Sequence, residues 1–311
     1  MPVIEVEGLV KTYGAARVVD GVSFTVEPGE IFGIVGPNGA GKTTIVESMV
    51  GLRRPDGGTI RVLGLDPLRD RAELTRRVGV QLQGSTLQDR IRVDEVMRLY
   101  SSFHDEPLDW RDLLEVLGLG ERLRASYADL SGGQKQRLAA ALALLGAPEV
   151  VVLDELTTGL DPHARRDTWD TIERTRDAGV TVVLVTHFMD EAERLCDRLM
   201  VVRRGRVVAV APPDELVRRL GADQRLRFRP SRPLDETLLA DVAGVATVER
   251  DGSRVVVTGT GDLGGAVVAF LAARHTTAED LRASRPDLED AYLALTGGPD
   301  EALAPTTEVR S

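Results

Sequence analysis

Short apolar runs mark the chain before residue 190 and predict buried β-strands. They are EIFGIV at residues 30–35, VVVL at 150–153 and VTVVLVT at 180–186. Runs of this length suit the strands of a parallel sheet that is covered on both faces. Stretches with the composition of helices begin at residue 43 (TTIVESMVGL) and at residue 134 (QKQRLAAALALL). The pattern therefore predicts an α/β fold.

After about residue 220 the pattern changes to short alternating segments and two further helices. The segments are 225–230 (RLRFRP), which its proline ends, a hairpin within 247–258 that turns at Asp251 and Gly252, and helices at 264–274 and 288–295. We expect a main domain at residues 1–220 with a helical subdomain at about 86–147, a small α+β domain at 221–297 and a loose tail at 298–311.

A glycine-rich motif follows the first apolar run. Residues 36–44 read GPNGAGKTT and fit the phosphate-binding pattern of Gly, four residues, Gly, Lys and Ser or Thr, although a glycine-rich turn can match by accident. A strand, a glycine loop and a helix in this order place backbone N–H groups around phosphates. Lys42 would reach the β and γ phosphates, and the Thr43 hydroxyl would ligate Mg²⁺. The predicted ATP-binding residues in this motif are Gly36, Pro37, Asn38, Gly39, Ala40, Gly41, Lys42, Thr43 and Thr44.

A second glycine motif, LSGGQ, precedes the helix that is predicted at 134–145. It comprises Leu130, Ser131, Gly132, Gly133 and Gln134. A Ser-Gly-Gly turn that opens a helix is an anion-binding surface. The alternative is a plain helix cap, with Ser131 as the N-cap residue. One chain would then hold two helix N-termini directed at phosphate, and the second would be redundant if both served one nucleotide in a monomer.

Two carboxylates follow the apolar run at 150–153. In an α/β sheet that binds phosphate, ligands lie at the ends of strands, where Asp154 and Glu155 are expected. Asp154 would hold the Mg²⁺ shell, and Glu155 would orient or deprotonate the attacking water. The alternative is a pair of ordinary surface acids. The two preceding motifs favour the metal and catalytic roles.

With these motifs, residues 3 to about 220 resemble the ATP-binding subunits of ABC transporters. The resemblance implies a P-loop ATPase with bound ATP and Mg²⁺, in which two nucleotide domains pack head to tail, here expected as a homodimer. The phosphate loop of one domain and the LSGGQ of the other would close on the same ATP. Ser131, Gly132 and Gly133 would therefore act in trans.

The same resemblance implies roles for residues outside the three motifs. His187, after the run at 180–186, would contact the γ-phosphate, and Tyr13 would stack on adenine. Gln83 would link the metal site to the transmembrane partner, although Gln81 is a close alternative. The loop across the dimer interface would be Gly159, Leu160 and Asp161. Together with Glu155, these give the catalytic set Glu155, His187, Gln83 and Lys42, and the metal set Thr43, Gln83 and Asp154.

One departure and one subgroup signal refine the resemblance. Leu156 stands where the family usually has proline. Proline would fix the backbone after Glu155, so Leu156 is expected to loosen this turn, but the replacement removes no chemical group. The ending RPDLEDAYLALTGG, at 285–298, resembles the C-terminal extension of drug and antibiotic exporters of the daunorubicin-resistance type. Segments 157–172 and 186–198 carry the same resemblance. We therefore expect an export ATPase.

Composition agrees with a peripheral ATPase and excludes other classes. The formal net charge of −10 argues against a nucleic-acid binder. Cys196 is the only cysteine, so no intramolecular disulfide forms. We find no apolar segment long enough to span a bilayer and no signal segment at the N-terminus.

We therefore expect a cytoplasmic-face ATPase that drives a separate permease. The docking surface for the permease is expected near residues 84–99, where Leu87, Ile91, Val93, Val96 and Leu99 could instead serve plain helix packing. The alternatives for the whole chain are a soluble ABC-type ATPase that acts on nucleic acid or ribosomes, and an importer subunit. The cargo cannot be read from this chain, because its contacts would belong to the permease.

Overall fold

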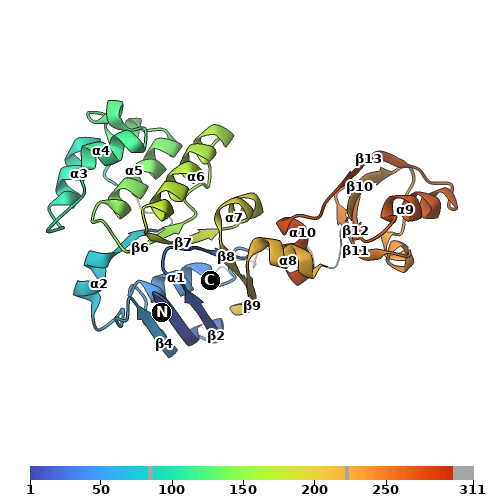
Figure 1. Ribbon diagram of the computed structural model, residues 1–311, viewed down its shortest axis with the longest axis horizontal. Helices are drawn as coiled ribbons and strands as arrows, with labels where there is room; N and C mark the ends of the chain where they lie inside the picture. The colour runs from blue at the N-terminus through green and yellow to red at the C-terminus, as the bar shows by residue number, and fades with distance from the viewer. Residues whose placement is uncertain (83–86, 221–223, 297–311) are drawn as a thin grey trace, which may run out of the picture. The chain divides into compact units, whose positions relative to one another are not determined.

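The computed structural model describes residues 1–82, 87–220 and 224–296 (Figure 1). Two compact units divide between Pro212 and Pro213. The division falls before the predicted boundary at 220, because helix α8 (Pro213–Arg219) packs against α10 (Leu288–Thr296) within the second unit. The tail predicted at 298–311 lies outside the described residues.

A six-stranded sheet in the order β5-β6-β7-β3-β8-β9 forms the centre of the first unit. Its strands are β3 (Ile31–Val35), β5 (Val78–Gln81), β6 (Val150–Asp154), β7 (Thr181–Thr186), β8 (Arg198–Arg203) and β9 (Arg206–Ala211). All neighbours are parallel except β9, which runs antiparallel to β8. Every residue of β3, β6 and β7 is buried, which confirms the three strands that the apolar runs predict.

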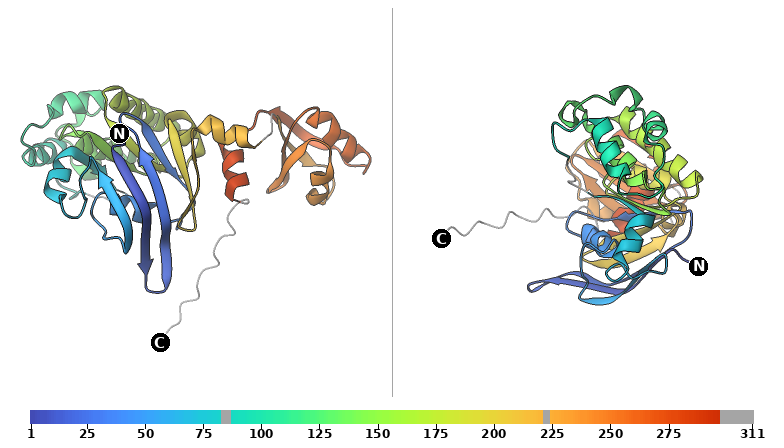
Figure 2. Two further views of the ribbon diagram at one scale, coloured as in Figure 1. Left: turned by 60° about the horizontal axis from the view of Figure 1, so that its bottom comes forward. Right: turned by 90° about the vertical axis from the view of Figure 1, so that its left-hand side faces the viewer.

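A three-stranded antiparallel sheet in the order β2-β1-β4 covers one face of the central sheet, as the left view of Figure 2 shows. Its strands are β1 (Ile4–Tyr13), β2 (Ala16–Val26) and β4 (Gly57–Val62). Helix α1 (Lys42–Met49) contributes Ile45 and Met49 to the core between the two sheets. The rings of Phe24 and Phe32 stack across this core with centroids 5.4 Å apart. The glycine loop that leads into α1 therefore lies between the two sheets.

Helices cover the other face of the central sheet (Figure 1). They are α3 (Val93–Ser101), α4 (Trp110–Val116), α5 (Gly132–Leu144), α6 (Pro162–Asp177) and α7 (Met189–Leu195), and α2 (Arg71–Arg77) leads into β5. The first three, α3 to α5, form the helical subdomain. Val93 and Val96 are buried in the core of this subdomain. Packing rather than exposure therefore explains these two members of the predicted docking surface, whereas Leu99 is 48% exposed.

The second unit contains a four-stranded antiparallel sheet in the order β11-β12-β10-β13. Its strands are β10 (Gln224–Pro230), β11 (Val245–Asp251), β12 (Arg254–Gly259) and β13 (Ala278–Ser284), and α9 (Leu263–Ala272) packs on them. Leu226, Phe228 and Val257 lie in its core. The predicted α+β class and the hairpin after Asp251 are confirmed.

Helix α10 in the second unit is tied to strand β10 by charge. Arg225 forms ion pairs with Asp287 and Asp290, each at 2.9 Å. Burial raises the pKa of Asp290 to about 6. These acids belong to the stretch 285–298 that resembles exporter subunits, so part of that sequence signal anchors a helix to its own sheet.

Candidate functional site

The glycine loop between β3 and α1 is closely packed against neighbouring backbone. Gly41 has a φ of 102°, and a Cβ added there would lie 2.7 Å from the carbonyl oxygen of Val18. A Cβ at Gly36 would lie 2.3 Å from the carbonyl oxygen of Val202. Gly41 is also the N-cap of α1, and no side chain caps this helix. The first N–H groups of α1 are thus available to a bound anion.

Lys42 is the first residue of α1, and its side chain is folded back on the loop. Its Nζ donates to the carbonyl oxygens of Gly36, at 2.7 Å, and Pro37, at 3.1 Å. Burial lowers the pKa of Lys42, and the carboxylates of Glu155 and Asp154 partly offset this effect. The site therefore holds a desolvated ammonium close to two acids, which an anionic ligand would stabilise further.

The two acids lie at the C-terminal end of β6, beside the ends of the adjacent parallel strands β5 and β7. Asp154 ends β6 and is 1% exposed, and its backbone N–H donates to Oε1 of Gln81 on β5 at 3.1 Å. Glu155 follows with a φ of 53°, and its N–H donates to the carbonyl oxygen of Val185 on β7 at 2.9 Å. This sparsely populated backbone conformation turns the chain out of the sheet directly after Asp154.

His187 lies beside Glu155 because β7 and β6 end together. Its Nδ1 is 3.3 Å from Oε1 of Glu155. A carboxylate at this distance fixes the orientation of an imidazole ring and can exchange a proton with it. The arrangement can therefore orient water and a terminal phosphate between an acid and a histidine.

A cavity of about 590 Å³ brings most of these predicted residues together. It is lined by Val18, Asn38, Gly39, Gly41, Lys42, Thr43, Thr44, Glu155, Thr158 and His187. Val18 and Thr158 are not among the residues that the motifs predict. Thr158 lies within the segment DELTTGLD, next to the predicted acids, whereas nothing in the sequence distinguishes Val18.

Several predicted residues that the structure describes do not line this cavity, namely Tyr13, Gly36, Pro37, Ala40 and Asp154. Tyr13 ends β1 and is 40% exposed, and the guanidinium of Arg53 lies 5.2 Å from the centre of its ring. Gln83 lies outside the described residues. Its alternative, Gln81, instead bonds to the backbone of Asp154.

The LSGGQ motif opens α5 away from the cavity of its own molecule. Ser131 is the N-cap of α5, and its hydroxyl accepts from the backbone N–H of Gln134 at 3.3 Å. Oε1 of Gln134 accepts in return from the N–H of Ser131 at 3.0 Å, which completes a capping box. Ser131 and Gly132 are exposed, whereas Leu130 is buried. Within a single chain the motif thus forms the predicted helix cap, on an open surface.

The predicted dimer loop is packed beside this motif. A Cβ at Gly133 would lie 3.2 Å from Cδ2 of Leu160. Nε2 of Gln136 donates to the carbonyl oxygen of Thr158 at 2.7 Å. Asp161 caps α6 by accepting from the N–H groups of the next turn. The loop at 159–161 therefore joins the cavity wall at Thr158 to the exposed LSGGQ surface.

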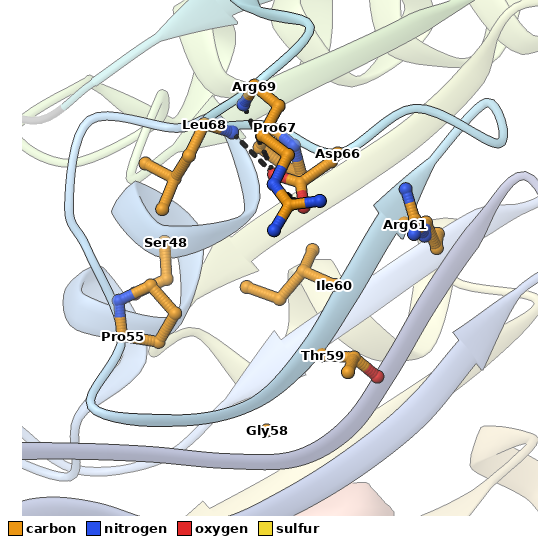
Figure 3. Close-up of a pocket in the computed structure, with 10 residues that line it drawn as sticks. All are labelled: Ser48, Pro55, Gly58, Thr59, Ile60, Arg61, Asp66, Pro67, Leu68 and Arg69. Atoms are coloured by element: carbon orange, nitrogen blue, oxygen red, sulfur yellow. Dashed lines mark hydrogen bonds and ion pairs between the residues drawn. The ribbon is translucent and has the colours of Figure 1, made fainter.

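A second, smaller cavity of about 310 Å³ lies outside this site (Figure 3). It is lined by Ser48, Pro55, Gly58, Thr59, Ile60, Arg61, Asp66, Pro67, Leu68 and Arg69. Asp66 there accepts from the backbone N–H groups of Leu68 and Arg69 and so completes its own turn. The cavity contains no residue of the three motifs.

An uncapped helix after a glycine loop, with a buried lysine and a strand-end acid beside a histidine, defines a nucleotide hydrolase of the P-loop class. The sequence model of the ABC transporter family matches residues 19–158 of this chain. The chain belongs to the ATP-binding subunits of ABC transporters, and its activity is ATP hydrolysis.

Relatives and solved structures support this family along most of the chain. The Nod factor export ATP-binding protein I of Ralstonia nicotianae is 39% identical, covering 95% of this chain and 94% of that protein. The daunorubicin/doxorubicin resistance ATP-binding protein DrrA of Streptomyces peucetius is 35% identical, covering 95% and 93%. A solved ATP-binding subunit of an ABC transporter has a TM-score of 0.65 and 29% identity, covering 70% of this chain and 93% of that one. The described residues hold no helix with the length and hydropathy of a membrane span.

Proposed function

We propose that this chain powers the export of a hydrophobic compound through a separate membrane permease. The single observation that carries the proposal is the cavity in which Lys42 faces the pair formed by Glu155 and His187. Two relatives of the same family, which match this chain along more than nine tenths of their length, are named for the export of Nod factor and for resistance to daunorubicin and doxorubicin. The cargo class is inferred from those names.

Glu155 and His187 are proposed to carry the chemical step. Glu155 orients the attacking water and accepts its proton, and His187 contacts the γ-phosphate. Lys42 leaves the carbonyl oxygens of Gly36 and Pro37 to bind the β and γ phosphates. Hydrolysis then depends mainly on the electrostatic placement of the phosphates.

The donors beside Lys42 fit Mg²⁺. Thr43 lines the cavity, and the buried carboxylate of Asp154 lies close enough to Lys42 to offset part of the lowering of its pKa by burial. Few protein ligands are needed, because Mg²⁺ retains several waters and is shared with the phosphates. When bound, the ion would neutralise charge on the transferring phosphate, while Thr43 and Asp154 hold it in place. Gln83 is proposed as a further ligand.

The LSGGQ surface is proposed to act on the nucleotide of a second ATP-binding domain, taken here as a copy of this chain. Ser131 and Gly132 are exposed at the start of a helix, yet they do not line the cavity of their own molecule. Leu160 packs against Gly133, so the loop at 159–161 would lie at the same interface. Closure on ATP and opening after hydrolysis would drive the permease.

The permease is proposed to dock on the helical subdomain, which places the protein at the cytoplasmic face of the membrane. Leu99 is 48% exposed and Phe103 is 66% exposed near the end of α3. The rings of Tyr100 and Phe103 are 5.6 Å apart. These side chains provide an apolar surface at the C-terminal end of α3.

The catalytic assignment is tested by measuring phosphate release from ATP. We expect Glu155→Gln to bind ATP but to lose about a hundredfold or more of the turnover, because the general base is gone. Glu149→Gln is the matched control, since Glu149 directly precedes the same strand and pairs only at the surface with Arg77. Wild-type turnover in Glu155→Gln would refute the role of Glu155.

A further inference from the structure

Glu191 is a fully buried carboxyl group that does not line the site described above. It lies in the first turn of α7 and is 0% exposed. Its Oε1 accepts from the indole Nε1 of Trp169 on α6 at 2.9 Å. Burying a carboxyl group that has no hydrogen bonds costs free energy. The residues that contact Glu191 therefore indicate its role.

The carboxyl group of Glu191 lies against both segments that lead to the proposed catalytic side chains. Burial, the largest effect, raises the pKa of Glu191, and the neighbouring hydroxyls of Thr186 and Thr157 lower it again. Thr186 immediately precedes His187, and its Oγ1 also accepts from the backbone N–H of Phe188 at 3.0 Å. Thr157 lies two residues after Glu155. Neither Oγ1 of Thr157 nor Oε2 of Glu191 has a hydrogen-bond partner within the described residues, so the bond to Trp169 is the one that fixes the carboxyl group.

A second set of contacts joins the same elements one helical turn away. The guanidinium of Arg165 on α6 lies 4.3 Å from the ring centre of Phe188 and 3.5 Å from the carboxylate of Asp190. The rings of Phe188 and His187 are 4.1 Å apart. Arg165 and Trp169 are four residues apart and so share a face of α6. Helix α6, which begins after the loop at 159–161, is thus attached to the His187 segment at two levels.

We propose that Glu191 is a positioning residue, whose hydrogen bond to Trp169 fixes the start of α7 against α6 and so holds His187, four residues earlier, in the arrangement that hydrolysis needs. The inference rests on the proposed roles of Glu155 and His187. Glu191 touches neither reacting group and acts through Trp169 and the first turn of α7. Loss of this bond would change the 3.3 Å separation between His187 and Glu155 without removing either group.

The test compares three carboxyl variants in steady-state ATP hydrolysis. We expect Glu191→Ala to lower kcat about tenfold or more while KM for ATP changes less than about threefold, because mispositioning affects the chemical step more than binding. Glu191→Gln keeps an acceptor for the Trp169 indole and should restore most of the turnover. Glu193→Ala, an exposed carboxyl on the same helix, is the matched control and should retain it.

A second variant keeps the test decisive if Glu191→Ala does not fold. Trp169→Phe removes the indole N–H and retains an aromatic ring, so we expect a smaller fall in kcat with KM again almost unchanged. Wild-type kcat in Glu191→Ala, or in Trp169→Phe when the first variant does not fold, would overturn the proposal. An equal loss of kcat in Glu191→Gln and Glu191→Ala would also overturn it, because the role assigned to Glu191 is hydrogen bonding.

Fluorescence and a parallel measurement separate this inference from the proposed function. The chain has two tryptophans, so in a Trp110→Phe background the emission reports Trp169 alone. Glu191→Ala should shift that emission and Glu193→Ala should not, and an unshifted emission would count against the contact. If Glu155→Gln stops hydrolysis while Glu191→Ala and Trp169→Phe do not slow it, only the positioning role fails. If Glu155→Gln keeps its turnover, the proposed site itself fails.

Discussion

Two helices of the first unit begin at glycine motifs, and their N-termini differ in every respect that matters for binding. Helix α1 begins after Gly41, has no side-chain cap and presents its N–H groups to a cavity that holds the buried Lys42. Helix α5 begins after Ser131, which closes a capping box with Gln134, and it opens onto the surface. One terminus is a preformed anion site, and the other satisfies its own first turn.

This difference indicates which terminus works within a single chain. The α1 terminus has its cavity, its lysine and its strand-end acids in the same molecule. The α5 terminus has exposed polar groups, and its residues do not line that cavity. Its anion site would be completed only when another molecule supplies phosphate. Changes at α1 should therefore affect binding by one chain, and changes at α5 should affect only events that need two.

The largest expected effect is on nucleotide binding by the single chain. Lys42→Ala should weaken binding of a fluorescent ATP analogue by about a hundredfold or more, because a desolvated charge partner of the phosphates is lost. Lys135→Ala, on α5, should bind the analogue like the wild type. Equal weakening in both variants would mean that the two termini do not differ in the way proposed.

The next effect concerns the backbone of the two motifs. Gly41→Ala places a Cβ 2.7 Å from the Val18 carbonyl oxygen at a φ of 102°. We expect it to lower the free energy of unfolding by ~2–3 kcal/mol and to weaken binding of the analogue, though less than Lys42→Ala does. Gly132 has no atom within 4 Å of such a Cβ, so Gly132→Ala should leave both quantities unchanged. Urea denaturation and titration measure them, and a stable, binding-competent Gly41→Ala would contradict the packed-loop account.

The residues of the α1 site are easier to predict from the sequence than the residues around them, because their roles depend on side-chain identity. The glycines, Lys42, the acids at 154–155 and His187 are distinctive residues at strand ends, and the structure gathers them as far as it describes them. Val18 escaped notice because its carbonyl oxygen, not its side chain, approaches Gly41. Any residue at position 18 would supply that atom.

Other features of the chain also depend on tertiary contacts or burial that the local sequence does not show. Strand β13 (AEDLRAS) was not predicted, because it is an exposed edge strand without an apolar run. The domain boundary was expected at 220 and lies instead between Pro212 and Pro213, because packing of α8 against α10 is a tertiary contact with no local signal. Glu191 was not singled out from the sequence, because no local pattern shows that its carboxyl group is buried.

A smaller effect is expected from Ser131→Ala. It removes the N-cap of α5 and should cost about 1 kcal/mol of stability. If Ser131 also serves the nucleotide of a second chain, turnover should fall roughly tenfold while binding of the analogue by the single chain stays unchanged. Asp109→Ala is the matched control, because Asp109 caps α4 away from the proposed interface. If turnover is unchanged in Ser131→Ala and both variants lose the same stability, the LSGGQ motif serves only as a helix cap.

The smallest effect distinguishes a charged cap from a neutral one. The N–H groups of Ala164 and His163 lower the pKa of Asp161 from its ordinary value of 3.8. The stabilisation from this ionised cap is therefore complete above pH 3.8 and is lost as the pH falls through the lowered value in the folded state. The difference in unfolding free energy between wild type and Asp161→Ala should shrink over this acid range, whereas that for Ser131→Ala should stay constant. Parallel pH profiles in urea denaturation would show that the Asp161 carboxylate is not what stabilises the start of α6.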